Sequence, residues 1–223
     1  MSKHGREPLT AFTIAMNYVP CVYVLVGGLT AWRLADGWGG LVLAALLWIY
    51  VVPPLVCRAA MLAWGRPAGR GLTQACRAYK VWWFVNQMQV IHNRFPMFDE
   101  FLRLFPGAYA AWLRCWGSSV SPLVHWAPGS RVVDRSLLVV ERLAVIGMDA
   151  GFAGHLGTFD AEGTYRLDVA PSIVREGAIM GGKSGLGPGC ELGPGEILPV
   201  GKLLPPFTTW TGGRKIHQPR DMP

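Results

Sequence analysis

The chain has 223 residues, of which 51% are hydrophobic and 16% are charged, and its formal net charge is +7. Because soluble domains average roughly 25% charged residues, this composition is typical of a membrane-associated protein. The basic residues are not grouped with aromatic residues in a nucleic-acid-binding motif. Anionic lipid headgroups are therefore the expected partner, and nucleic acid is not.

The five cysteines, at positions 21, 57, 76, 115 and 190, are scattered and form no CxxC pair or Cys/His cluster. This pattern argues against a disulfide framework and against a zinc site. It favours reduced thiols in a protein that faces the cytosol.

The first 71 residues are predicted to form a transmembrane hairpin. Residues 9–34 carry no charge until Arg33, and residues 38–57 carry none. Each run supplies the ~20 apolar residues that cross a ~30 Å hydrocarbon core. Prolines at 20, 53 and 54 are expected to kink these helices. The alternative is a pair of buried helices in a soluble protein; a cleaved signal peptide is disfavoured because a second apolar run follows at once.

Basic residues flank the hairpin on its outer ends, at positions 3, 6, 58, 66, 70, 77 and 80. The positive-inside rule then places both ends in the cytoplasm, which predicts a bacterial-type inner-membrane protein whose later domains face the cytoplasm.

Residues 72–121 are predicted to form amphipathic helices in the lipid headgroup layer, separated at Pro96 and Pro106. Their large apolar faces also carry Lys80, Arg94, Arg103 and Arg114, as interfacial helices do. Ordinary core packing against the following domain is an equal alternative, and both could hold on opposite faces. A third possibility is that these helices are membrane-embedded and grip a lipid substrate.

Aliphatic residues recur every six positions in the glycine- and proline-rich second half. Ile173 is followed by Ile179, and Leu186 by leucines at 192, 198 and 204. Helices repeat every 3.6 residues and strands every two, so a period of six favours a left-handed parallel β-helix of three to four turns. We place it at 122–210, with a polar tail at 211–223. The expected fold class is an α+β membrane protein.

The predicted period has two interruptions. Val140, Ile146 and Phe152 keep the spacing, but residues 153–172 break it and are interpreted as a loop that projects from the coil. A one-residue slip is expected between Ile179 and Leu186.

The segments "VVDRSLLVVERLAVIG", "AGHLGTFDAEG" and "APSIVREGAIMGGKSGLGPGCELGPGEILPVGKLLPP" resemble the hexapeptide-repeat acyltransferases, which are left-handed β-helix enzymes. The wider stretch 95–205 is similar to a membrane-associated branch that includes the carboxy-terminal domains of poly-amino-acid synthetases. The likeness covers about half of the chain. It departs at 187–189 and 193–195, which are Gly-Pro-Gly where the family often has Gly-Asp-Gly or Gly-Ala-Gly.

The resemblance implies a histidine base that deprotonates a hydroxyl or amine as it attacks a thioester, with backbone amides stabilising the oxyanion. His155 matches the position of the family's catalytic histidine, and Gly151, Gly154 and Gly157 would let substrate approach its ring. A structural loop histidine is the alternative. The other four histidines are weaker candidates: His4, His92, His125 and His217.

Asp134 is the preferred residue to orient His155. Its alternative role is to bond backbone at a corner or to pair with Arg135. Glu141, Asp149 and Asp160 are weaker candidates.

The donor is expected to be an acyl-CoA or carrier-protein thioester, with no bound cofactor and no metal. Lys183 and Ser184 are predicted to meet its phosphates or pantetheine, helped by Arg175 and Lys202; a solvated basic edge is the alternative. His155 is the one histidine in the hexapeptide register 140–204, so the three-histidine zinc site of a γ-class carbonic anhydrase is not expected.

These features together predict a membrane-anchored acyltransferase that moves an acyl or aminoacyl group to a hydroxyl or amine. The resemblance implies a homotrimer, and an acyl carrier protein is a candidate partner. The alternative function is a non-catalytic trimeric β-helix scaffold of a membrane complex.

Overall fold

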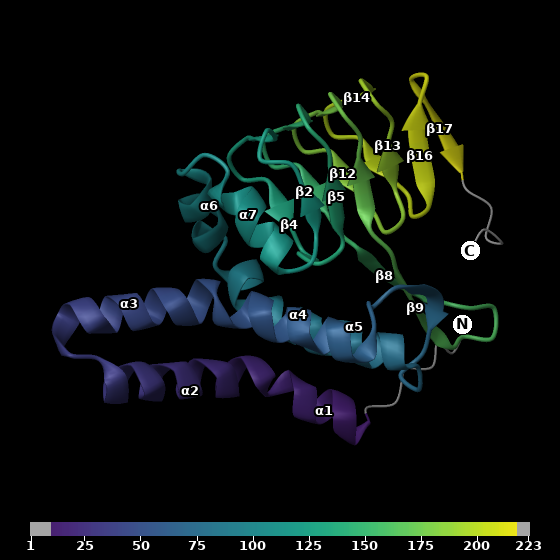
Figure 1. The fold of residues 1–223 in the computed structure, drawn as a ribbon. Helices are drawn as coiled ribbons and strands as arrows, with labels where there is room; N and C mark the ends of the chain where they lie inside the picture. The colour runs from purple at the N-terminus through teal and green to yellow at the C-terminus, as the bar shows by residue number, and fades with distance from the viewer. Residues whose placement is uncertain (1–9, 218–223) are drawn as a thin grey trace.

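The computed structural model describes residues 10–217. Figure 1 shows two parts, a stack of long helices from the first half of the chain and a coil of short strands from the second half, which lies along the helices. The protein is therefore α+β, as predicted, with helices preceding parallel-strand sheets.

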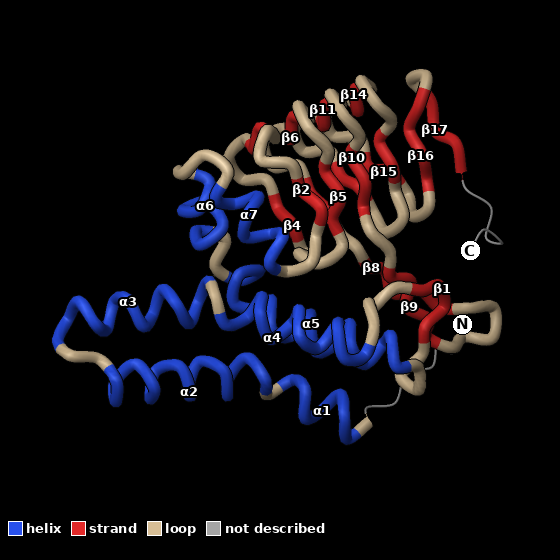
Figure 2. Tube along the Cα trace, viewed as in Figure 1, coloured by secondary structure: helices blue, strands red, loops and turns tan. Residues whose placement is uncertain are grey.

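The first four helices form a hairpin of two broken rods (Figure 2). One rod is α1 (Ala11–Asn17) with α2 (Val19–Leu34), and the other is α3 (Gly37–Tyr50) with α4 (Val52–Trp64). The predicted kinks are confirmed: the breaks at Tyr18 and Val51 come just before the prolines, which are tolerated only in a helix's first turn. The rods span 24 and 28 residues with mean hydropathies of 1.6 and 2.3, so by length and composition each could cross a membrane.

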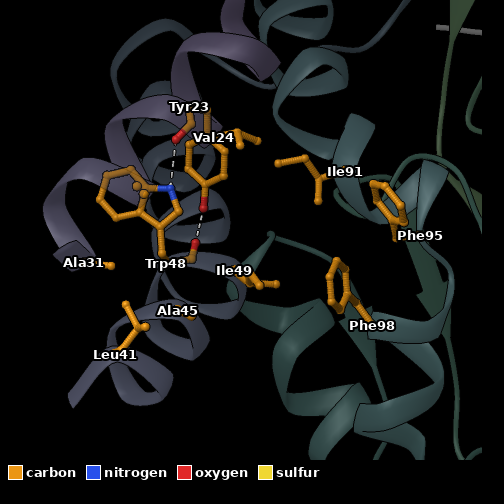
Figure 3. Close-up of a pocket in the computed structure, with 12 residues that line it drawn as sticks. Tyr23, Val24, Ala31, Leu41, Ala45, Trp48, Ile49, Ile91, Phe95 and Phe98 are labelled. Atoms are coloured by element: carbon orange, nitrogen blue, oxygen red, sulfur yellow. Dashed lines mark hydrogen bonds between the residues drawn. The ribbon is translucent and has the colours of Figure 1, made fainter. Parts of the chain in front are cut away.

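Polar groups between the two rods are paired with each other (Figure 3). Tyr23 of α2 donates its hydroxyl hydrogen to the carbonyl oxygen of Trp48, and Trp48 Nε1 donates to the Tyr23 carbonyl oxygen at 3.0 Å. Beside this contact lies an apolar crevice of about 380 Å³, which reaches Ile91 and Phe95. Paired polar groups suit a lipid environment, where no water replaces a missing partner.

Three helices connect the hairpin to the coil: α5 (Arg77–Arg94), α6 (Met97–Arg103) and α7 (Ala108–Cys115). Val85 of α5 and the α7 residues Trp112 and Leu113 belong to the same buried core as the coil. The core-packing alternative therefore holds for these faces of α5 and α7. By contrast, α6 leaves Met97 and Phe101 64% and 46% exposed, so an interfacial role for α6 stays a prediction.

Three parallel sheets form the sides of the coil. The first sheet contains β2 (Ser119–Val120), β5 (Leu138–Val140), β10 (Ser172–Val174), β13 (Glu191–Leu192) and β16 (Thr208–Thr211), with β17 (Arg214–His217) antiparallel at its edge. The second contains β3 (His125–Trp126), β6 (Val145–Ile146), β11 (Ile179–Met180) and β14 (Ile197–Leu198). The third contains β4 (Arg131–Val132), β7 (Gly151–Phe152), β12 (Gly185–Leu186) and β15 (Leu203–Leu204). Successive strands visit the three sheets in turn, which makes a three-sided parallel β-helix.

The boundaries of the coil differ slightly from those predicted. It begins with β2 at Ser119 rather than at 122. The predicted polar tail contributes β17, whose antiparallel pairing with β16 covers the sheet edge; residues 218–223 lie outside the described part of the chain.

The inward-facing residues correct one prediction. Val174 and Met180 are fully buried, whereas Ile179 is 36% exposed, so Ile173 and Ile179 occupy the neighbouring outward positions. Successive strand residues point to opposite sides of a sheet, so the prediction was one position out of register at Ile173 and Ile179. The other predicted inward residues are buried: Val140, Ile146, Phe152, Leu186, Leu192, Leu198 and Leu204. With Met180 as the inward residue, the spacing to Leu186 is six, and the slip predicted between 179 and 186 does not exist.

Two corners of the coil depart from the six-residue period, and both lie between the third sheet and the first. Inward Val132 is followed by Val140 after eight residues, and Phe152 by Val174 after twenty-two. The longer insertion confirms the predicted break. It forms the hairpin β8 (His155–Phe159) and β9 (Tyr165–Val169), which pairs with β1 (Gly69–Leu72) between α4 and α5. These stacked corners carry Asp134 and His155.

Candidate active site

Asp134 and His155 meet where the two irregular corners stack. Asp134 Oδ2 lies 2.7 Å from His155 Nδ1 and accepts a hydrogen bond from the Gly154 N–H at 2.8 Å. The other carboxylate oxygen accepts from Trp82 Nε1 of α5 at 3.2 Å. Asp134 is 3% exposed, so these three donors take the place of water around a buried carboxylate.

The bond to Asp134 determines the tautomer of His155. A carboxylate can only accept, so Nδ1 carries the hydrogen and Nε2 is left as a lone-pair acceptor. The His155 side chain is 26% exposed and its ring packs against Trp82, with 4.7 Å between ring centroids. The ring is thus held in one orientation while Nε2 stays available for a proton.

Gly154 is required by the close approach of the two corners. A Cβ atom there would lie 2.8 Å from Leu137 Cβ and 3.1 Å from Asp134 Cβ, both on the preceding coil. Any side chain at 154 would therefore push the His155 corner away from Asp134.

A groove of about 480 Å³ runs past His155 along the third sheet. In register across this sheet, the outward positions hold Arg131, Gly151, Gly185 and Leu203. The backbone at Gly151 is bare, whereas at Gly185 a methyl group of Leu203 lies 2.8 Å from where a Cβ atom would stand. At Gly151 a ligand can therefore lie directly on the sheet beside the His155 ring.

Lys183 and Ser184 line the same groove. Lys183 adopts a left-handed conformation with φ of 59°, and its N–H donates to the Met148 carbonyl oxygen at 2.7 Å. Ser184 is buried, and its Oγ has no hydrogen-bond partner within residues 10–217. The structure thus brings a cation and an unpaired hydroxyl to the groove; their role toward a donor stays a prediction.

Arg175 lies elsewhere. It is not among the groove residues, and its guanidinium bonds Glu191 at 2.6 Å and Glu141 at 2.8 Å on the first sheet. These hydrogen bonds raise the pKa of Arg175 and the Arg175 bond lowers the pKa of Glu141. Arg175 and Glu141 therefore form a surface ion pair away from His155.

The remaining candidates are dispersed. Asp149 lines the groove, Asp160 pairs with Arg166 in the β8–β9 hairpin, and Lys202 lies over the Trp210 ring. The other histidines are apart from the site as well: His92 is buried on α5, His125 is exposed on the second sheet, His217 is exposed on β17, and His4 lies outside the described residues.

Sequence reasoning missed Trp82 and Arg131. Trp82 is one of several tryptophans on an apolar helix, and only the packing of α5 on the coil shows that its indole reaches Asp134. Arg131 could have been found from the repeat itself, because it precedes the inward Val132 and so points outward. Among residues 10–217, no group of three or more metal-ligating side chains is present.

Repeat geometry identifies the type of coil. From Val174 to Leu204 an inward residue recurs every six positions, with one strand on each side of the prism. The coil is a hexapeptide-repeat β-helix.

No protein-family profile and no curated protein matches this chain. Among solved structures, it is similar to a hexapeptide-repeat acetyltransferase from Vibrio cholerae, at 11% identity and a TM-score of 0.34 over 60% of this chain and 93% of that one. That enzyme complexed with acetyl coenzyme A gives 12% identity and a TM-score of 0.34, over 58% and 86% of the two chains. A serine acetyltransferase from Neisseria gonorrhoeae gives 14% identity and a TM-score of 0.21, over 96% and 82%.

Proposed function

We propose that this protein is an acyltransferase that moves an acyl or aminoacyl group from a thioester to a hydroxyl or amine. The observation that carries the proposal is the His155–Asp134 pair, at 2.7 Å, beside a groove whose floor is bare backbone at Gly151. A buried carboxylate that orients a partly exposed imidazole is the arrangement that general base catalysis requires.

In the proposed reaction His155 Nε2 takes the proton of the acceptor O–H or N–H as that atom attacks the thioester carbonyl carbon. The tetrahedral intermediate collapses, the C–S bond breaks, and the thiolate leaves with the proton from the imidazolium. Asp134 stays ionised and stabilises the transient imidazolium. Lys183 at the groove would meet the phosphates of an acyl-CoA or carrier-protein donor.

A matched pair of histidine variants tests this function. The full chain in detergent would be given acetyl-CoA and longer acyl-CoA thioesters with a panel of amines and alcohols, and thiol release would be followed. His155→Ala is expected to lower the rate by about 10²–10⁴-fold, the usual contribution of a general base. His125→Ala, an exposed histidine on the second sheet, is the control and should retain the wild-type rate. An enzymatic rate that is unchanged in His155→Ala, with unchanged oligomeric state and melting temperature, would refute His155 as the base. Wild-type thiol release no faster than in the absence of protein, with a cellular phenotype that survives His155→Ala, would favour the non-catalytic scaffold.

We also propose that the hairpin anchors the protein in an inner membrane with the coil on the cytoplasmic side. Two long apolar rods and exposed apolar residues on α6 support this placement. It would bring the groove close to the bilayer, which suits a lipidic donor or acceptor. Cysteine-labelling of the exposed Cys115 in intact cells and in inverted vesicles tests the orientation.

A homotrimer is the proposed assembly. Ile179 and Ile197 occupy outward positions of the second sheet, and Ile197 is 60% exposed. Such an exposed apolar ladder is typical of a surface that a second copy covers. Light scattering should give the mass of a trimer for the wild type and a smaller mass for Ile197→Lys.

A further inference from the structure

A second, polar cavity lies beside the groove, between α5, α6 and the coil. It has a volume of about 120 Å³ and opens at the exposed residues Pro96 and Arg131. Arg131 and Val133 line both this cavity and the groove. The two spaces are therefore neighbours. His155 lines the groove and not the cavity, and Asp134 lines neither. The cavity has its own set of polar groups.

Four of those groups are buried atoms with no hydrogen-bond partner within residues 10–217. They are His92 Nδ1, Asp99 Oδ1, Ser130 Oγ and Arg135 Nε. All four residues line the cavity, and each is at most 4% exposed. Because a buried polar atom without a partner is costly, four around one cavity indicate that something polar occupies it.

The bonds already made by these side chains define what is missing. Asp99 Oδ2 accepts from Tyr109 and from Arg135 Nη2, each at 2.9 Å, so only Oδ1 is free. Arg135 Nη1 donates to Asn93 at 2.6 Å, which leaves Nε as a donor without an acceptor. The side chains are thus held in place, and the atoms left without partners define which hydrogen bonds an occupant would have to supply.

His92 adds a second free acceptor. Its Nε2 lies 3.2 Å from the Ile49 carbonyl oxygen and must donate to it. Burial lowers the pKa of His92, so the ring is neutral and Nδ1 carries a lone pair. That lone pair lies 3.6 Å from Asp99 Oδ1, too far for a hydrogen bond. Two acceptors therefore face each other, and an occupant must supply hydrogens to both.

The charges limit the class of occupant further. Asp99 and Arg135 neutralise each other, so a buried monocation or monoanion would be uncompensated. An ammonium group supplies three hydrogens, which match His92 Nδ1, Asp99 Oδ1 and Ser130 Oγ. A carboxylate would accept from Arg135 Nε, with Arg131 nearby at the mouth. At ~30 Å³ per water the cavity has room for about four waters, the scale of a small organic molecule.

We propose that this cavity is a binding site for a small zwitterion of the α-amino acid class, with its ammonium on His92, Asp99 and Ser130 and its carboxylate on Arg135. The proposal does not depend on acyl transfer.

Isothermal titration calorimetry on the full chain in detergent tests the site, with glycine, L-alanine and L-serine as probes and no thioester present. Saturable binding is expected for these, and not for ethylamine or acetate, which each lack one of the two charged groups, nor for glycerol, which lacks both. Ser130→Val removes one acceptor and adds bulk, so it should weaken binding at least tenfold. Thr208→Val removes another buried hydroxyl at the far end of the coil and should leave binding unchanged.

His155→Ala should bind the amino acids like the wild type, which separates this site from the proposed catalytic function. If Ser130→Val does not fold, Ser130→Ala replaces it, with weaker binding expected. The proposal is overturned if no amino acid binds, if ethylamine or glycerol binds equally well, or if both Ser130 variants bind normally. Ordered water alone in the cavity of a crystal soaked with glycine would overturn it too.

Discussion

Replacing Trp82 by phenylalanine tests how the helices control the dyad. The change keeps an aromatic ring against His155 and removes the N–H that Asp134 Oδ1 accepts at 3.2 Å. Trp82 and Asp134 are 4% and 3% exposed, so water does not readily replace the lost donor. A hydrogen bond to a charged group contributes about 1.5–3 kcal/mol. A loss of about 2 kcal/mol that is felt in the transition state and not in the ground state, as misorientation of the His155 ring would produce, is a decrease of about 30-fold in rate.

A double-mutant cycle isolates this bond. Thiol release from acyl-CoA would be measured for the wild type, Trp82→Phe, Asp134→Ala and the double variant. Because the indole acts through the carboxylate, Trp82→Phe should slow the wild type about 30-fold and change little once Asp134 is absent. The coupling energy should be about 2 kcal/mol.

The neighbouring Trp83 is the matched control. It stacks on Tyr79, and its Nε1 is buried without a hydrogen-bond partner in the described chain, so Trp83→Phe should leave the rate unchanged and cost little stability. Trp82 does not act through Asp134 if the rate losses of Trp82→Phe and Asp134→Ala simply multiply in the double variant. The same conclusion follows if Trp83→Phe slows the reaction as much as Trp82→Phe.

Gly154→Ala should lower both activity and melting temperature, because its Cβ would meet Leu137 at 2.8 Å; a wild-type rate would contradict that crowding. Gly151→Val has open space around its Cβ, so it should leave the melting temperature unchanged but raise KM for the thioester by filling the groove. Burial lowers the pKa of His92 in the folded protein below the 6.5 of the unfolded chain. As the pH drops below 6.5, the unfolded chain therefore takes up a proton on His92 before the folded protein does, and the free energy of unfolding falls. Urea unfolding of His92→Gln between pH 5 and about pH 7 should lack this fall. Carbonate washing at alkaline pH should leave the chain in the membrane pellet, and release into the supernatant would refute the anchor.

The coil could be predicted because its determinants are local. Inward residues such as Leu186, Leu192 and Leu198 are separated by one strand and one corner each. The spacing alone therefore predicts how many residues form one side of the coil. The register error at Ile179 has the same origin: an outward isoleucine and an inward methionine are adjacent, and hydrophobicity alone does not rank them. Glycine at 185 then makes the outward position next to Leu186 part of the groove.

The site was only partly predictable. His155 could be proposed from the family resemblance, and Asp134 from its position one or two coils earlier; the structure brings the two into contact, while their roles remain proposals. Arg175 and Lys183 are both cations of the repeat region and are both predicted to meet the donor. Arg175, however, lies on the first sheet, where its guanidinium bonds the carboxylates of Glu191 and Glu141. Trp82 could not be found from spacing, since its contact with Asp134 depends on how a helix docks on the coil.

The two irregular corners also join the coil to the helices. Leu137, Leu167 and Val169 come from these corners and form a buried cluster with Tyr79 and Trp82 of α5. Shortening both corners to the six-residue form found between two neighbouring inward leucines would keep the inward residues of the coil in line. It would also delete the imidazole, its carboxylate and the apolar layer through which the coil docks on α5, so catalytic geometry and domain docking are inherited together in this chain.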